Sequence, residues 1–90
     1  MAGVNGAKFK LMPSSPEADL TAIQDAAKKI VEDFGGENKE YEVVPLAFGL
    51  NSVTVFFFYP DDKDLEPLDE QFGAIENVAS AELIDQRKIY

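Results

Sequence analysis

The stretch Asn51-Ser52-Val53-Thr54-Val55-Phe56-Phe57-Phe58-Tyr59 is the most apolar segment of the chain, and it decides the fold. β-branched and aromatic residues dominate it, which is typical of a β-strand. Side chains alternate between the two faces of a strand. One face would carry Val53, Val55, Phe57 and Tyr59, and the other would carry Thr54, Phe56 and Phe58. Apolar residues on both faces predict a central strand. We expect the face that begins with Val53 to point into the core.

Three further segments are predicted strands: Val4–Met12, Glu37–Val44 and Val78–Arg87. In the first segment Phe9 and Leu11 alternate with lysines, the period of a half-buried strand. The second has one mostly polar face. In the last we expect Leu83 to share a face with Ala81 and Asp85.

Two segments repeat apolar residues at the period of a helix: Glu17–Phe34 and Asp64–Glu76. Ser15 followed by Pro16 predicts the N-cap and first position of the first helix. Gly35-Gly36 predicts a left-handed stop at its other end. We expect the second helix to tolerate Pro67 in its first turn and to end at Asn77.

The predicted order is therefore strand, helix, strand, strand, helix, strand. Two strand-helix-strand units with right-handed crossovers form a four-stranded antiparallel sheet with both helices on one face. The predicted class is α+β, with the ferredoxin-like β-α-β-β-α-β arrangement, in which the first and third strands are central. At 90 residues the chain predicts one domain, spanning residues 1–90.

Composition excludes several classes of function. The chain has no cysteine and no histidine, which removes thiolate zinc sites, cysteine nucleophiles and the usual general base. Seventeen acidic residues against eight basic ones give a net charge of −9, which repels nucleic-acid phosphates. No leader-like or membrane-length apolar run is present, so we expect a cytoplasmic protein with no membrane contact.

Motifs for covalent chemistry or metal binding are weak. Asp61-Asp62-Lys63-Asp64 lacks the glycine and distal glutamate of a calcium loop, and a solvated turn explains it. Glu40 and Glu42 are explained by an exposed strand face. Phe56 and Phe58 resemble the stacking platforms of RNA-binding sheets, but the flanking basic residues are missing. We expect neither an enzyme nor a cofactor or metal site.

The loop Pro45-Leu46-Ala47-Phe48-Gly49-Leu50 is unusually apolar for a connection between strands. The ring of Phe48 either packs against the edge of the core or is exposed for binding to a partner. A second unusual feature is the basic pair Arg87-Lys88 in an otherwise acidic chain. The candidate partner-binding residues are therefore Leu46, Phe48 and Gly49 in the loop, together with Arg87 and Lys88.

Four segments together resemble the elongation factor 1-beta family, the guanine-nucleotide exchange factors of archaeal and eukaryotic translation, in their short archaeal-type form. These segments are Phe9-Lys10-Leu11-Met12-Pro13, Ser15-Pro16-Glu17-Ala18-Asp19-Leu20, the loop Pro45–Leu50 and the closing Arg87-Lys88-Ile89. The resemblance covers nearly the whole chain and implies a ferredoxin-like fold.

The resemblance also implies a partner, elongation factor 1-alpha, a GTPase. By likeness, the aromatic residue at Phe48 would insert into a hydrophobic pocket of that GTPase, and Lys88 would reach toward its magnesium and phosphate site. Two alternatives stay open on the sequence: a small-molecule-binding regulatory module of the same fold, and a scaffold subunit. The small-molecule module gives neither Phe48 nor Lys88 a role.

Overall fold

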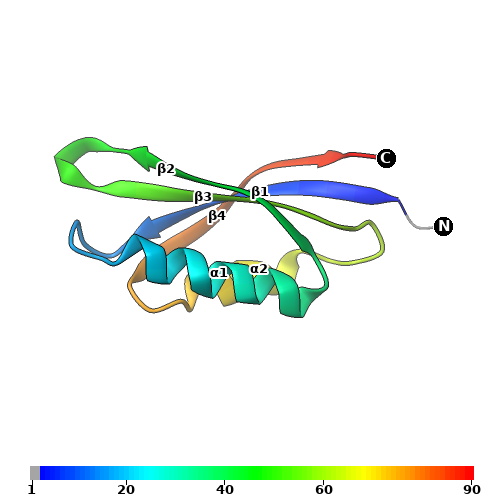
Figure 1. The fold of residues 1–90 in the computed structure, drawn as a ribbon, viewed down its shortest axis with the longest axis horizontal. Helices are drawn as coiled ribbons and strands as arrows, with labels where there is room; N and C mark the ends of the chain where they lie inside the picture. Colours follow the sequence, from blue (N-terminus) through cyan, green and yellow to red (C-terminus); the bar gives the residue numbers. More distant parts are fainter. Residues whose placement is uncertain (1–2) are drawn as a thin grey trace.

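A computed structural model describes residues 3–90, and these form the predicted order of elements (Figure 1). The elements are β1 (Val4–Pro13), α1 (Leu20–Phe34), β2 (Glu37–Pro45), the short 3-10 turn η1 (Ala47–Gly49), β3 (Asn51–Pro60), α2 (Glu66–Gly73) and β4 (Val78–Lys88). The principal extents are 45 × 20 × 18 Å, because the strands run along the longest axis.

The strands form one antiparallel sheet in the order β2-β3-β1-β4. Both helices cover the same face of this sheet (Figure 1). The ferredoxin-like arrangement predicted from the element order is thus confirmed, with β1 and β3 in the centre. The loop between β2 and β3 lies at one end of the sheet, and the start of β1 and the end of β4 lie at the other (Figure 1).

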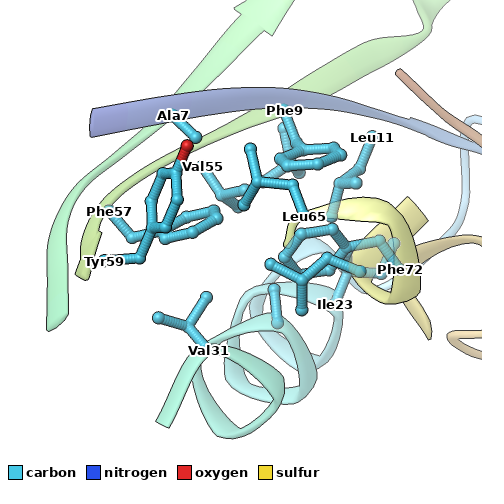
Figure 2. Close-up of a cluster of buried hydrophobic side chains, with 13 residues drawn as sticks. Ala7, Phe9, Leu11, Ile23, Val31, Val55, Phe57, Tyr59, Leu65 and Phe72 are labelled. Atoms are coloured by element: carbon cyan, nitrogen blue, oxygen red, sulfur yellow. The ribbon is translucent and has the colours of Figure 1, made fainter. Parts of the chain in front are cut away.

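The core lies between the sheet and the helices (Figure 2). The face of β3 predicted to point inward does so, since Val53, Val55, Phe57 and Tyr59 are all buried. Phe9 of β1 packs edge-on against Phe72 of α2, with ring centroids 4.9 Å apart. Buried aromatic pairs of this kind stabilise a fold beyond the apolar area they remove from water.

Helix α1 begins later than its sequence pattern predicts. Its N-cap is Asp19, whose carboxylate accepts the backbone N–H groups of Thr21 and Ala22 at 3.1 and 3.2 Å. Ser15 instead belongs to a turn, where its carbonyl accepts the N–H of Ala18 at 3.3 Å. The prediction of Ser15 as N-cap is therefore wrong, whereas Gly35 ends the helix with a positive φ of 93°, as expected.

Helix α2 is shorter than predicted at both ends, running from Glu66 to Gly73. Ala74 is the C-cap, and its N–H donates to the carbonyls of Glu70 and Gln71. Asn77 adopts a positive φ of 70° just before β4, so it ends the connecting turn rather than the helix.

Strand β4 contains a register shift, and the predicted facing of Asp85 is wrong because of it. The register with β1 shifts between Lys8 and Phe9, so that Leu83 pairs with Phe9 and Asp85 pairs with Lys8. Because an extra residue in a strand reverses the facing of those beyond it, Asp85 lies on the open face with Lys8 and does not share the face of Leu83.

Candidate functional site

The loop between β2 and β3 closes as a tight turn. The N–H of Leu46 donates to the carbonyl of Leu50 at 2.7 Å, and the N–H of Leu50 donates to the carbonyl of Ala47 at 3.3 Å. Between them, Phe48 and Gly49 have φ of 61° and 75°. Two central residues with positive φ characterise type I′ turns, whose twist matches that of a β-hairpin.

Phe48 is the most notable residue of this turn. Its side chain is 95% exposed, so the ring does not pack on the core edge. Leu46 and Leu50 are half-buried at the base of the turn. A left-handed conformation costs a residue with a Cβ about 1 kcal/mol or more, and an exposed aromatic ring recovers none of it by packing. The turn thus displays an apolar side chain at a local cost in stability.

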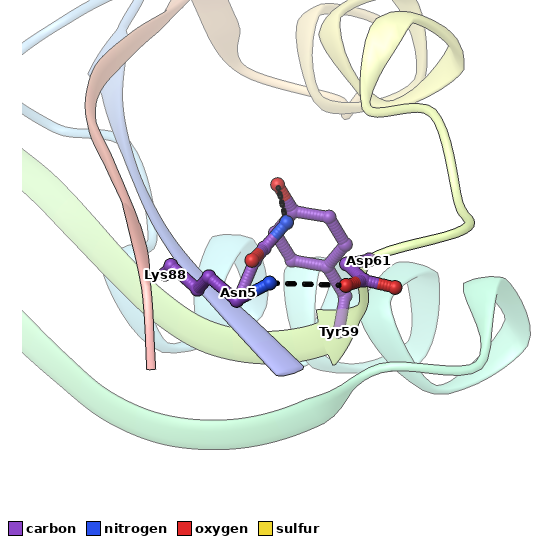
Figure 3. Close-up of polar contacts among 4 residues, drawn as sticks. All are labelled: Asn5, Tyr59, Asp61 and Lys88. Carbon is purple, nitrogen blue, oxygen red and sulfur yellow. Dashed lines mark hydrogen bonds and ion pairs between the residues drawn. The ribbon is translucent and has the colours of Figure 1, made fainter. Parts of the chain in front are cut away.

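Lys88 lies at the other end of the sheet, opposite Asn5 of β1. Its ammonium nitrogen Nζ is 3.5 Å from Oδ2 of Asp61, the residue that follows β3. Figure 3 shows the Lys88 side chain running past Asn5 toward this carboxylate. The Lys88 side chain is 68% exposed, so its charge remains accessible to a partner.

The segment around Lys88 is fixed by backbone hydrogen bonds to the start of β1. The N–H groups of Ile89 and Tyr90 donate to the carbonyl of Val4 at 2.8 and 3.1 Å, and the N–H of Val4 donates to the carbonyl of Tyr90 at 2.6 Å. The backbone that carries Lys88 is therefore ordered, although its side chain is long and exposed.

Arg87 faces the opposite side of the sheet. It pairs with Gly6, and its guanidinium nitrogen Nη2 lies 2.5 Å from Oδ2 of Asp85. This hydrogen bond with Arg87 lowers the pKa of Asp85. Because neighbouring side chains of a strand point to opposite faces, Arg87 and Lys88 do not form one basic patch.

The structure does not bring the two groups of candidate residues together. Phe48 precedes β3, whereas Lys88 contacts Asp61 just beyond its other end. The ten residues of β3 span about 30 Å at about 3.3 Å per residue. Leu46, Phe48 and Gly49 thus lie at one end of the sheet, and Arg87 and Lys88 lie at the other.

The sequence pattern did not predict which side chains surround Lys88. Asn5, Tyr59 and Asp61 lie beside it (Figure 3), and the Tyr59 hydroxyl accepts Nε2–H of Gln86 at 2.6 Å and Nδ2–H of Asn5 at 3.5 Å. The predicted fold indicates where to look for them, because a ferredoxin-like sheet places the start of β1 beside the ends of β3 and β4.

The open face of the sheet carries an aromatic pair covered by lysines. Phe56 and Phe58 pack edge-to-face with centroids 5.5 Å apart. The ammonium of Lys39 lies 4.7 Å from the ring centroid of Phe58, and that of Lys8 lies 5.7 Å from that of Phe56. The expectation that basic residues are missing beside this pair is therefore wrong, because the strand register brings Lys8 of β1 and Lys39 of β2 over the rings. The net charge of −9 remains the argument against a nucleic-acid ligand.

A shallow cavity of about 360 Å³ lies beside the end of β3. Its lining includes the glycines Gly35 and Gly36 and the aromatic residues Phe58 and Tyr59. Glu37 is the one charged residue among the described lining residues, and its side chain is 70% exposed. Small-molecule sites instead combine apolar walls with several converging polar groups. This cavity gives little support to the small-molecule alternative.

The acidic segments form no metal centre among residues 3–90, where no group of three or more carboxylates gathers closely enough to hold an ion. Asp61 and Asp62 lie in the turn after β3, as the sequence predicts, and Glu40 and Glu42 are exposed on β2. Within the same range, neither helix has the length and apolar character needed to cross a membrane.

Comparison with known proteins gives a consistent result. The family description "EF-1 guanine nucleotide exchange domain" matches residues 7–89. The chain belongs to the EF-1 guanine nucleotide exchange domain family. This confirms the likeness predicted from the loop Pro45–Leu50 and the segments around it, and the matched range includes both ends of the sheet.

Archaeal members of this family are similar over most of their length. Elongation factor 1-beta of Methanococcus maripaludis strain C5 is 36% identical over 80 residues, covering 88% of this chain and 90% of the relative. The protein of the same name from Nanoarchaeum equitans is 37% identical over 77 residues, covering 84% and 94%. That of Methanobrevibacter smithii is 33% identical over 84 residues, covering 92% and 93%.

Proposed function

We propose that this protein is a cytoplasmic translation elongation factor, active as one domain over residues 1–90, that promotes exchange of GDP for GTP on elongation factor 1-alpha. Phe48, flanked by Leu46 and Gly49, inserts into a hydrophobic pocket of that GTPase. Lys88 reaches toward the GTPase's magnesium and phosphate site, and Arg87, on the opposite face of β4, is a further contact residue at the same end of the sheet. The exchange involves no covalent chemistry and no cofactor of this chain. Family membership and the names of the archaeal relatives support the general activity.

The exposure of Phe48 is the observation that carries the proposal. A phenylalanine ring that is 95% exposed at the tip of a hairpin gains nothing from its own domain. Transfer of such a ring into an apolar pocket is favourable by about 1.5–3 kcal/mol. Aromatic anchors at the centre of an interface typically lose about 2 kcal/mol of binding when truncated. The positive φ values of Phe48 and Gly49 belong to the tight turn that carries the ring.

Lys88 suits the second role by its chemistry. A GTPase holds its nucleotide through phosphate contacts and a bridging magnesium ion. An ammonium group placed near the metal site disfavours magnesium by like-charge repulsion, and a compact charge on a flexible stem can enter such a site more easily than a planar guanidinium. By thermodynamic reciprocity, a factor that weakens nucleotide binding is itself bound less tightly when the nucleotide is present.

The separation of the two ends constrains how one partner can be engaged. Since Phe48 and Lys88 lie about 30 Å apart along β3, both act at once only on a partner surface that extends over that distance. The net charge of −9 favours approach to a basic surface.

The first test measures binding to elongation factor 1-alpha. We expect Phe48→Ala to weaken binding about 30-fold, equivalent to about 2 kcal/mol, because the anchor is lost. Titration of the nucleotide-free GTPase with each variant measures this. Val43→Ala is the matched control, since Val43 is also an exposed apolar residue, 41% accessible on β2. Equal affinities of the wild type and Phe48→Ala would contradict the role of the loop.

The second test measures release of a fluorescent GDP from preloaded elongation factor 1-alpha. We expect Lys88→Ala to lower the release rate at saturating exchange factor roughly tenfold or more while binding survives. Lys29→Ala removes an exposed lysine of α1 and serves as the control. A release rate that is unchanged in Lys88→Ala removes this lysine from the mechanism.

A further inference from the structure

We infer that Tyr59 and Asp61, both from the end of β3, are positioning residues for Lys88. The inference rests on the proposed function of Lys88 and adds a role for two residues outside the proposed contact set. Tyr59 holds the side chain of Gln86 on β4, two residues before Lys88, and Asp61 acts on the ammonium group itself. Figure 3 shows the two residues beside the lysine.

The Tyr59 hydroxyl is a polar group at the edge of an otherwise apolar layer. Tyr59 is 2% exposed, and its ring packs against Phe57 and Phe34 at centroid distances of 6.0 and 6.2 Å. A phenylalanine would make these ring contacts equally well. The added hydroxyl lies beside the small side chain of Ala7 (Figure 2) and reaches Gln86 of β4 at 2.6 Å.

This hydrogen bond joins two strands that are not neighbours. β1 lies between β3 and β4 in the sheet, so the backbone ladder does not connect Tyr59 to Gln86 directly. The same hydroxyl also accepts Nδ2–H of Asn5, which pairs with Lys88. The phenol therefore fixes the last part of β4 to the buried end of β3, and Lys88 lies within the fixed part.

Asp61 restrains the other end of the lysine side chain. Its backbone N–H donates to the carbonyl of Gly3 at 3.0 Å, which fixes the residue beside the start of β1. Its carboxylate lies 3.5 Å from the Lys88 ammonium and is 30% exposed, against 68% for the lysine. Exposed ion pairs add little to stability. The effect of this one is to restrict a flexible side chain to one direction, which reduces the ordering cost when the lysine engages its target.

The experiment measures GDP release from elongation factor 1-alpha over a range of exchange-factor concentrations. We expect Tyr59→Phe and Asp61→Asn each to lower the maximal release rate by roughly threefold to tenfold, because a misplaced reacting group loses rate. The half-saturating concentration should stay unchanged, since Phe48 is untouched. Asp61→Glu should recover much of the lost rate.

Two control variants make the same Tyr→Phe and Asp→Asn substitutions at other positions. Tyr41→Phe deletes another partly buried hydroxyl, bonded to Asn38 on β2, and Asp62→Asn neutralises the exposed carboxylate next to Asp61. Both should release GDP at the wild-type rate. In a Lys88→Ala background, Tyr59→Phe and Asp61→Asn should cause no further loss, because residues that act through one group are not additive.

Three results would overturn the inference. These are an unchanged or faster release in the single variants, an equal further loss in the Lys88→Ala background, and a shift confined to the half-saturating concentration. If Tyr59→Phe fails to fold, the release rate of Asp61→Asn, which lies in an exposed turn, still tests the inference. A wild-type rate for Lys88→Ala alone refutes the proposed role of Lys88 and the positioning role with it, whereas a slow Lys88→Ala with unaffected Tyr59→Phe and Asp61→Asn refutes only the positioning.

Discussion

The two ends of the sheet display their candidate side chains by opposite means. At the β2–β3 turn, Phe48 is held by backbone conformation alone, with a positive φ of 61° and a ring that is 95% exposed. At the other end, Lys88 is accompanied by Asp61 at 3.5 Å and carried on a segment hydrogen-bonded to Val4. A rigid ring needs only a fixed backbone, whereas a flexible lysine gains from side-chain restraints.

The largest expected effect separates Phe48 from the core aromatics. Phe57→Ala should lower the free energy of unfolding by about 3–5 kcal/mol, because Phe57 is fully buried beneath the helices. Phe48→Ala should change it by less than about 0.5 kcal/mol. Urea denaturation followed by circular dichroism measures both. A loss in Phe48→Ala comparable to that in Phe57→Ala would mean that the loop is part of the core and would break the comparison.

A smaller effect is expected at the Lys88 end from Gly3→Ala. A Cβ at Gly3 would lie 2.6 Å from the carbonyl oxygen of Tyr90 and 2.7 Å from Oδ2 of Asp61, closer than such atoms approach without displacement. We expect a loss of about 1–3 kcal/mol in unfolding free energy from this overpacking. GDP release at saturation should slow as well, with the half-saturating concentration unchanged.

Gly73→Ala is the control for that variant. A Cβ at Gly73 meets nothing within 4 Å, so this variant should leave GDP release unaffected. If Gly3→Ala instead weakens binding and leaves the maximal rate alone, the segment beside Lys88 does not serve the lysine, and the two ends differ less than we infer.

The strain at the turn itself can be measured with Phe48→Gly. Glycine adopts positive φ without a Cβ penalty, so this variant should raise the unfolding free energy by up to about 1 kcal/mol while binding to the GTPase is lost. Gly49→Ala, at φ of 75°, should lower it by about 1 kcal/mol. Thermal and urea unfolding of both variants provide the comparison. A destabilised Phe48→Gly would show that the ring contributes to folding.

The elements that the sequence predicted well are those decided by local pattern. Apolar residues on both faces of Asn51–Tyr59 predicted that β3 is central, and the face expected to point inward, with Val53, Val55, Phe57 and Tyr59, is buried. The start of α1 was not decided locally, because Ser15 and Asp19 are both good N-caps and only the turn that contains Ser15 selects between them. The facing of Asp85 failed because a register shift has no periodic signature.

The candidate site divides in the same way. An apolar loop with a glycine after its aromatic residue is visible in the sequence, and so is the basic pair Arg87-Lys88. That the pair is split between two faces follows from strand geometry alone. The contacts of Lys88 with Asp61 and Asn5 join residues far apart in the chain and depend on the register of three strands, which periodicity does not give.

The smallest expected effect is a pH dependence that arises from Asp85 on β4 and is absent from the β2–β3 turn. The hydrogen bond from Arg87, with a further contribution from Lys8, lowers the pKa of Asp85 in the folded protein. A lowered folded-state pKa stabilises the fold above the unfolded value, about 3.9, and this contribution is lost as the pH falls through the folded pKa. The Asp85 side chain is 37% exposed and that of Arg87 is 63% exposed, so solvent screens the pair and we expect only a small change in stability.

A carboxyl-detected NMR titration should therefore show Asp85 titrating below an ordinary aspartate in the wild type and returning toward the ordinary value in Arg87→Ala. The amide signals of β4 around Asp85 and Arg87 should shift with that titration. Those of Ala47–Gly49 should not follow it, because the turn contains no titratable side chain and joins β2 to β3, which β1 separates from β4. Amide shifts of Phe48 that track the Asp85 titration would mean that the two ends of the sheet are coupled. A partner bound at one end would then change the conformation of the other end without contacting it.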